Sequence, residues 1–102
     1  MTATPTAAGP AKVRMVGFDL QENDDSRAII DAVEQDNDGV IVSRMPGLVR
    51  AQCPQRMVVQ RTSVEQHLGR PWDTQEFQLT IVSYFGHIDD YDDDQVVVAW
   101  SH

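Results

Sequence analysis

Three short runs of β-forming residues, separated by only a few turn residues, constrain the fold of this chain most. The runs cover residues 40–43, 48–53 and 57–60, and Met45-Pro46-Gly47 and Pro54-Gln55-Arg56 lie between them. Connections this short join neighbouring antiparallel strands, whereas parallel strands need crossovers of about a dozen residues or more. The sequence therefore predicts an antiparallel meander in the middle of the chain.

A strand and a helix are expected before this meander. Residues 13–20 alternate in character, with apolar side chains on one face, which predicts a strand. The acidic cluster 22–25 offers caps for a following helix, and apolar residues then recur at helical spacing up to about Asp36. The Asn37-Asp38-Gly39 run then predicts a turn into the first run of the meander.

A second helix is expected after the meander. Thr62-Ser63-Val64-Glu65 has the form of a capping box, in which two residues satisfy each other's free amides. Gly69 is a natural left-handed terminator, and Pro71 prevents the helix from continuing. Asp73-Thr74-Gln75-Glu76 can cap a second short helical turn in the same way.

The apolar period changes to two from Phe77 onward. One face of the predicted strand carries Phe77, Leu79, Ile81 and Ser83, and the other carries Thr80, Val82 and Tyr84. An acidic connection, residues 89–94, then leads to a last strand with Val96, Val98 and Trp100. The predicted order is β-α-β-β-β-α-(α)-β-β. This order is typical of an α+β fold with a mostly antiparallel sheet and two or three short helices.

The length and composition indicate one small domain. Residues 1–11 contain no large apolar side chain except Met1 and are expected to form a mobile tail, which leaves residues 12–102 as the domain. No stretch approaches the roughly 20 apolar residues of a membrane helix, and residues 1–11 lack the pattern of a signal peptide. We therefore expect a cytoplasmic protein that does not enter membranes.

The chain is acidic, with a formal net charge of -8. Such a charge repels phosphate groups, which weighs against nucleic acids and anionic membranes as partners and suits a basic protein surface.

Residues that could support catalysis or bind metal are few. His67, His87 and His102 are too widely spaced for a typical zinc site, and Cys53 is the only cysteine. A calcium loop starting at Asp90 would have Gln95 and Ser101 where glycine and glutamate are required. We therefore predict no metal, no cofactor and no catalytic residue, with an inert, buried Cys53 thiol. A small thiol- or metal-dependent enzyme that uses Cys53 and the histidines is the less favoured alternative.

From Arg61 onward the chain resembles the effector, or coupling, proteins of bacterial multicomponent soluble diiron monooxygenases, which oxidise methane, phenol, toluene, alkenes or propane. The resemblance is concentrated in residues 63–77, where a helix ends in Leu-Gly-Arg-Pro-aromatic before a short helix, and it continues through the apolar strand 79–88. Residues 26–34 and the final Trp-Ser-His are weaker matches to the phenol hydroxylase subgroup. Trp72 departs from the family's more usual Phe.

The resemblance implies a cofactor-free regulatory protein, monomeric when free, that binds the hydroxylase component. There it would tune oxygen activation, substrate access and turnover without being an enzyme itself. The residues matched to the family's contact strand are Ser83, Tyr84, Phe85 and Gly86, with one of the two aromatic residues as an exposed anchor. Arg70 and Trp72 are a second choice, against a helix-terminal charge for Arg70 and core packing for Trp72. A generic protein- or ligand-binding adaptor remains the alternative, and the substrate of the monooxygenase stays open.

Overall fold

The computed structural model describes residues 14–100, which fold into two antiparallel sheets and three helices. The predicted tail, residues 1–11, and His102 lie outside the described residues, so the division into a tail and one domain over residues 12–102 stays a prediction. The elements in chain order are β1 (Met15–Gln21), α1 (Asp24–Asp36), β2 (Ile41–Met45), β3 (Leu48–Pro54), β4 (Arg56–Gln60), α2 (Arg61–Leu68), the 3-10 turn η2 (Thr74–Glu76), α3 (Phe77–Thr80), β5 (Ile81–Phe85), β6 (His87–Tyr91) and β7 (Gln95–Ala99).

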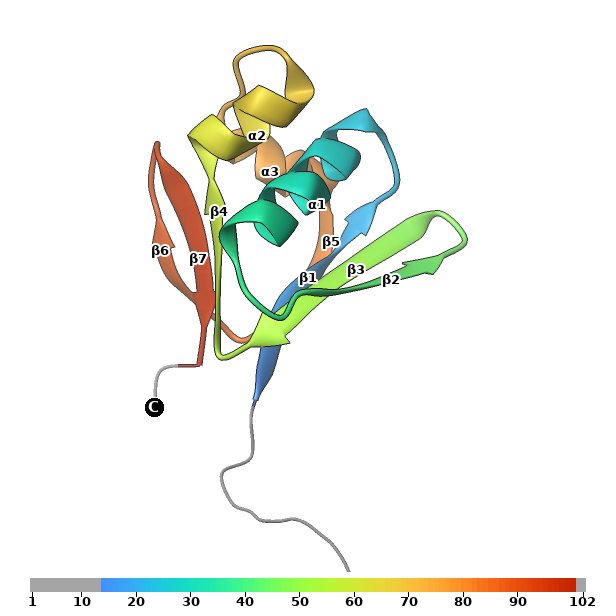
Figure 1. The fold of residues 1–102 in the computed structure, drawn as a ribbon, viewed down its shortest axis with the longest axis vertical. Helices are drawn as coiled ribbons and strands as arrows, with labels where there is room; N and C mark the ends of the chain where they lie inside the picture. The colour runs from blue at the N-terminus through green and yellow to red at the C-terminus, as the bar shows by residue number, and fades with distance from the viewer. Residues whose placement is uncertain (1–13, 101–102) are drawn as a thin grey trace, which may run out of the picture.

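The predicted α+β class and element order are confirmed, with β6 as an added strand. The first sheet has the order β2-β3-β1-β5 and the second the order β4-β7-β6. Figure 1 shows the second sheet on one side of the molecule and the β2–β3 hairpin extending on the other, with α1 between them. β5 and β6 are each the edge strand of their sheet, and Gly86 alone connects them.

Of the predicted three-stranded meander, the structure confirms the first hairpin and not the second. β2 and β3 form the expected hairpin, with Ile41 opposite Gln52 and Met45 opposite Leu48. The expected pairing of β3 with β4 is wrong, because β1 already occupies the other edge of β3 over its whole length. The chain instead turns at Gln55, whose φ of 66° is left-handed, and β4 pairs with β7 in the second sheet.

The acidic connection is shorter than expected, because its first part is the strand β6. β6 pairs with β7, and the turn between them is built on Asp92, whose Oδ1 accepts hydrogen bonds from the amides of Asp94 and Gln95 at 2.8 and 3.0 Å. The carboxylates of Asp89 and Asp90 are exposed on this edge strand. Charged side chains lower the strand signal in the sequence, yet they are common on edge strands, where they discourage aggregation.

Most helix ends lie where the sequence predicts them. Asn23 caps α1 in a box with Ser26, Gly69 ends α2 in the left-handed conformation, and Asp73 caps η2 in the predicted box with Glu76. The capping box predicted at Thr62 is wrong, because the N-cap of α2 is Gln60, two residues earlier, at the end of β4. The amide of Arg61 instead donates to the carbonyl of Asp94, 2.8 Å away in the β6–β7 turn.

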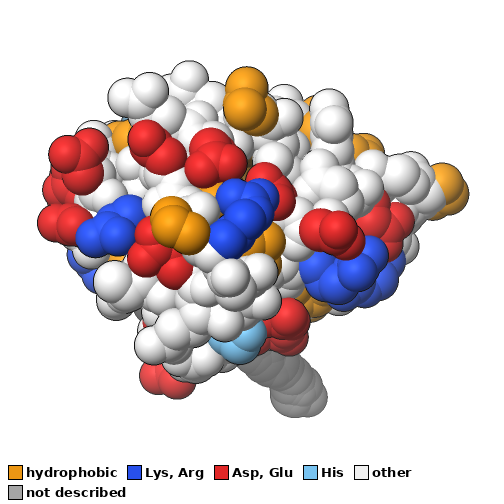
Figure 2. Space-filling view, turned by 90° about the horizontal axis from the view of Figure 1, so that it is seen from above, with side chains coloured by type: hydrophobic (Ala, Val, Ile, Leu, Met, Phe, Trp, Pro, Cys, Tyr) orange, Lys and Arg blue, Asp and Glu red, His pale blue; other side chains and the backbone are white. Residues whose placement is uncertain are grey.

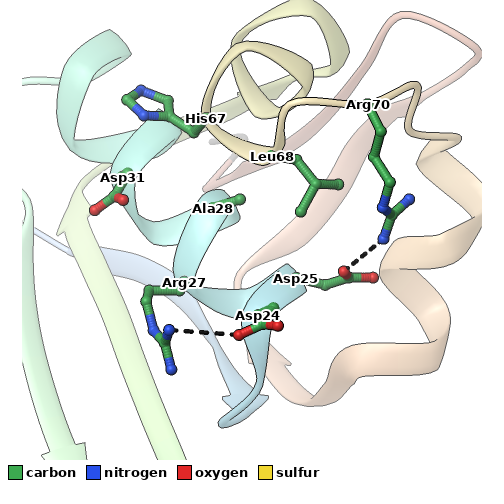
Figure 3. A pocket seen from close by; sticks show the side chains of 8 residues that line it. All are labelled: Asp24, Asp25, Arg27, Ala28, Asp31, His67, Leu68 and Arg70. Carbon is green, nitrogen blue, oxygen red and sulfur yellow. Dashed lines mark hydrogen bonds and ion pairs between the residues drawn. The ribbon is translucent and has the colours of Figure 1, made fainter.

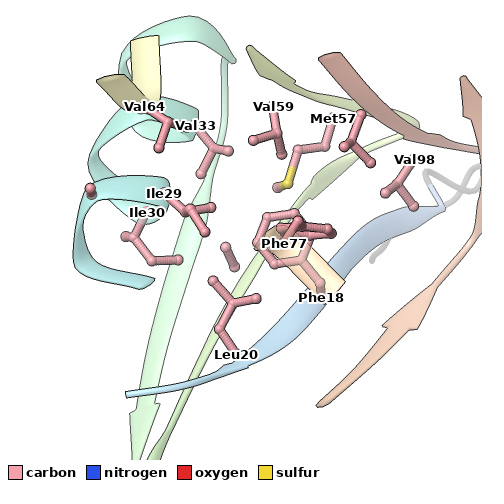
Figure 4. Packing of buried hydrophobic residues seen from close by; sticks show 14 of the residues in the cluster. Phe18, Leu20, Ile29, Ile30, Val33, Met57, Val59, Val64, Phe77 and Val98 are labelled. Carbon is pink, nitrogen blue, oxygen red and sulfur yellow. The ribbon is translucent and has the colours of Figure 1, made fainter. Parts of the chain in front are cut away.

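The core lies between α1, α3 and the inner faces of both sheets (Figure 4). Phe77 packs edge-on against Phe18 of β1, with ring centroids 5.1 Å apart. The predicted strand from Phe77 is wrong in its first four residues, because residues 77–80 form the helical turn α3 and β5 begins at Ile81. The helical turn lets Phe77 enter the core while Leu79 faces solvent.

Candidate partner-binding surface

A bulge in β5 determines which way the residues of the predicted contact strand face. Leu20 of β1 pairs with Ile81, but Asp19 pairs with Ser83, so Val82 is an extra residue with no partner. Paired residues lie on the same face of a sheet, and a bulge therefore changes the alternation. As a result Ile81 and Tyr84 both lie on the core side of the sheet, with Leu20 and Phe18, whereas Ser83 and Phe85 lie on the outer side.

β6 contains a matching bulge at the edge of the second sheet. Ile88 pairs with Val98 and Asp90 with Val97, which leaves Asp89 unpaired. Ile88 and Tyr91 therefore lie on the core side, opposite the buried Val98 and Val96. The sequence Ile-x-x-Tyr thus occurs once on each edge strand, at residues 81–84 and 88–91, and in both places the bulge turns the two apolar side chains to the same side.

These two Ile-Tyr pairs line an open apolar groove of about 300 Å³ between the edges of the two sheets. Phe77 and Gln78 of α3 complete the lining. Two of the lining residues, Tyr84 and Ile88, are exposed, and so are Leu79 of α3 and Val82 at the β5 bulge, which lie in the same segment of the chain. A concave apolar surface beside two edge strands can accept apolar side chains of a partner, and the exposed strand edges can pair with its backbone.

Gly86 forms the corner between the two edge strands. Its φ of 113° is unfavourable for other residues, and a Cβ there would lie 3.0 Å from methyl groups of Val16 and Val98. Gly86 therefore shapes the groove by letting the chain pass between the sheets over the core. Its predicted place in the contact strand stays a prediction, and its structural role follows from this geometry.

A charged cluster supports the outer side of β5. The Asp19 carboxylate accepts hydrogen bonds from Arg50 Nε at 2.7 Å, Arg50 Nη2 at 3.1 Å and Ser83 Oγ at 2.9 Å. The Arg50 guanidinium also lies over the Phe85 ring, 5.3 Å from its centroid. The hydrogen bonds from Arg50 lower the pKa of Asp19 below its ordinary value of 3.8, so this carboxylate is ionised at neutral pH.

The second-choice residues lie at the α2–η2 loop, away from the lining of the groove. Trp72 is 2% exposed and packs in the core, as its alternative interpretation predicted, so its ring is not available for direct contact in this conformation. Its amide donates to Glu65 Oε2 at 2.9 Å, which holds the loop against α2. Arg70 is exposed, and its Nη2 bonds Asp25 Oδ1 of α1 at 2.8 Å.

Arg70 borders a second, polar hollow of about 400 Å³ between α1 and α2 (Figure 3). The ion pairs Arg70–Asp25 and Arg27–Asp24, the latter at 3.4 Å, neutralise much of its charge. Among residues 14–100, no group of three or more His, Cys, Asp or Glu side chains is placed to hold a metal ion. The view from above in Figure 2 likewise shows carboxylates and guanidinium groups intermingled.

Cys53, His67 and His87, which the enzyme alternative would use, each contact different residues. The Cys53 thiol is buried 3.2 Å from the carbonyl oxygen of Arg56, and burial raises its pKa, which keeps it protonated. His67 is exposed and hydrogen-bonds Gln35, and His87 packs edge-on against Trp100. The predicted burial of Cys53 is confirmed, its inertness stays a prediction, and the described part of the chain forms no thiol–imidazole pair.

Comparison with known proteins places the chain in a family. The MmoB/DmpM family matches residues 14–99, which is most of the chain. This chain belongs to the MmoB/DmpM family. A curated member, the stimulatory component DmpM of phenol 2-monooxygenase from Pseudomonas sp. (strain CF600), is 34% identical over 88 residues, covering 86% of this chain and 97% of the relative. The predicted resemblance is therefore confirmed.

Solved structures agree with this membership. A chain in the structure of a phenol hydroxylase–regulatory protein complex is 36% identical, with a TM-score of 0.79 over 86% of this chain and 100% of that one. The regulatory protein B of soluble methane monooxygenase is 15% identical, with a TM-score of 0.66 over 93% of this chain and 71% of that one, and so shares the fold. Within residues 14–100 of this MmoB/DmpM member, no helix combines the length and apolar character needed to cross a bilayer.

Sequence reasoning identifies β5 but misses much of the surface around it. The period-two pattern places Leu79 and Val82 on the faces of a regular strand, and it assigns Ile88 and Tyr91 to no site. The repeated Ile-x-x-Tyr spacing is the available signal. Its meaning depends on the two bulges, which local sequence does not specify.

Proposed function

We propose that this chain is the regulatory component of a multicomponent monooxygenase and that it binds the hydroxylase component through the apolar groove and the edge of β5. The observation that carries the proposal is the open groove, bordered by exposed apolar side chains, in a chain that matches regulatory proteins over nearly its whole length. The match to a chain in a phenol hydroxylase–regulatory protein complex supports the hydroxylase as the partner.

The groove provides a binding surface and no chemistry of its own. Its lining consists of apolar and aromatic side chains with Gln78 as the amide, and the phenols of Tyr84 and Tyr91 are its ionisable groups, so it has no carboxylate, imidazole, amine or thiol. A protein of this kind changes a reaction by binding two states of the hydroxylase with different affinities. Regulation of oxygen activation and substrate access would follow from that difference.

The proposed contact residues are those expected from the sequence, but the structure gives them different roles. Tyr84 lines the groove and serves as the exposed aromatic anchor, while Ser83 and Phe85 contribute from the outer side of β5. Gly86 shapes the corner, and Arg70 lies at a more distant margin. A monomeric free state and a cytoplasmic location are part of the same proposal, which leaves the substrate open.

The direct test uses the purified protein and a purified hydroxylase–reductase pair from the same organism. Near-stoichiometric addition should raise substrate turnover or the fraction of reducing equivalents used for product. Calorimetry should detect binding to the hydroxylase alone. Equal turnover and coupling with and without the protein would contradict the proposal.

The replacement Tyr84→Ala should weaken hydroxylase binding by about 10- to 30-fold, since a central interface aromatic contributes about 1.5–2 kcal/mol or more. Ile41→Ala is the matched control, because Ile41 is 52% exposed and Tyr84 51%, and the two residues lie on opposite edge strands of one sheet. We expect less than about a twofold change for the control. Equal losses for both variants, measured by calorimetry, would argue against the groove as the binding surface.

A further inference from the structure

The buried carboxylate of Asp19 is unusual for its position. It lies in the middle of β1, between β3 and β5, and is 8% exposed on a strand whose other central residues are apolar or glycine. Burial of a charge costs free energy unless the charge is paired and hydrogen-bonded. Asp19 meets this condition through Arg50 on one neighbouring strand and Ser83 on the other, so it joins three strands side by side.

The hydrogen bond between Ser83 and Asp19 lies directly beside the bulge that sets the pairing register of β5. β5 is an edge strand with four pairs to β1, and its bulge falls between the Leu20–Ile81 and Asp19–Ser83 pairs. A slip by one residue would move Ile81 and Tyr84 away from the groove and turn other residues into it. The Ser83–Asp19 bond opposes that slip, and the Arg50 guanidinium over Phe85 supports the following residues.

We propose that Asp19, oriented by Arg50, is a positioning residue that sets the bulged register of β5 and thereby selects the side chains presented to the hydroxylase. This inference rests on the proposed function for its partner, although the register itself is a property of the free protein. Asp19 does not line the groove, and it acts through Ser83. The bidentate geometry makes Arg50 the group that fixes the carboxylate orientation.

The test combines Asp19→Asn and Ser83→Ala, singly and together, with Glu22→Gln as control. Glu22 forms an exposed ion pair with Arg44 at 3.5 Å next to the same sheet, so its replacement also removes a carboxylate–arginine pair but leaves β5 untouched. Ser83→Ala keeps the Asp19–Arg50 pair and removes the link to β5, together with any direct contact of the Ser83 hydroxyl with the hydroxylase. The β5 register in the free protein is therefore the measurement that decides for this variant, and it remains available if Asp19→Asn does not fold. Hydroxylase affinity is measured by calorimetry, and the β5 register by cross-strand nuclear Overhauser contacts between residues 19–20 and 81–83.

We expect Asp19→Asn to weaken hydroxylase binding roughly 10-fold, since it removes a charge-assisted hydrogen-bond network. The double variant should lose little more than Asp19→Asn alone, because both changes act through one link. The Asp19–Ser83 contacts should weaken in both single variants and persist in Glu22→Gln, which should bind like the wild type.

Unchanged cross-strand contacts in folded Asp19→Asn and in Ser83→Ala would overturn the inference, as would wild-type affinity in both. Losses that add fully in the double variant would also contradict it, because they would place Asp19 and Ser83 in independent roles. Failure of the wild-type protein to bind the hydroxylase would instead reject the proposed function. In that case the contacts in the free variants still decide whether Asp19 sets the register.

Discussion

Replacing Phe77 by Ala should lower the free energy of unfolding by about 3–5 kcal/mol, the usual cost of truncating a fully buried phenylalanine. Phe77 is 1% exposed, and its ring contacts Phe18 edge-on in the centre of the core. Truncation removes that aromatic contact and leaves empty space in the core beneath the groove. Chemical denaturation followed by circular dichroism measures the change. The loss is a large part of the stability expected for so small a domain.

Leu79→Ala is the matched control for this experiment. Leu79 is 79% exposed, although a period-two pattern places it on the same strand face as Phe77. In the helical turn α3 the two residues face different ways, so we expect a change within about 0.5 kcal/mol for Leu79→Ala. Comparable destabilisation by both replacements would show that residues 77–80 form a strand rather than α3.

Gly17→Ala should prevent stable folding or lower the free energy of unfolding by at least about 3 kcal/mol, at or beyond the upper end of overpacking costs. A Cβ at Gly17 would overlap the carbonyl oxygen of Ala51 and lie 2.8 Å from Cα of Gln52. Both atoms belong to the backbone of β3, which no side-chain rotation can move. The β1 and β3 strands would have to separate in the middle of the first sheet, with loss of ladder hydrogen bonds.

Gly47→Ala separates this steric cost from the general effect of removing a glycine. Gly47 has a φ of 74° in the β2–β3 turn, and a Cβ added there would have no other atom within 4 Å beyond its immediate chain neighbours. We expect a cost of roughly 1–2 kcal/mol, which reflects the left-handed backbone alone. The two variants are compared by thermal and chemical denaturation. If Gly17→Ala were no less stable than Gly47→Ala, the close approach of β1 and β3 would be refuted.

The candidate site shows why sequence reasoning reaches β5 but not its geometry. The sequence selects Ser83, Tyr84 and Phe85 together, yet the bulge at Val82 places Tyr84 in the groove and the other two on the outer face. A bulge depends on the partner strand, here on Asp19, more than 60 residues away in the chain. The buried Trp72 illustrates the same limit, since the sequence leaves both an exposed and a core position open.

The sequence by itself determined the features that depend on neighbouring residues. A cap within residues 22–25, the Gly69 helix end and the Asp73 capping box all act within a few residues, so local chemistry specifies them. Tertiary structure decided the features that depend on distant partners. β4 pairs with β7 rather than with β3, because β1 already pairs along the other edge of β3. Phe77 lies in a helical turn, because this conformation lets its ring pack against Phe18 in the core. The groove exists because residues beside two bulges, one in each sheet, line the same hollow, and only long-range strand pairing places them there.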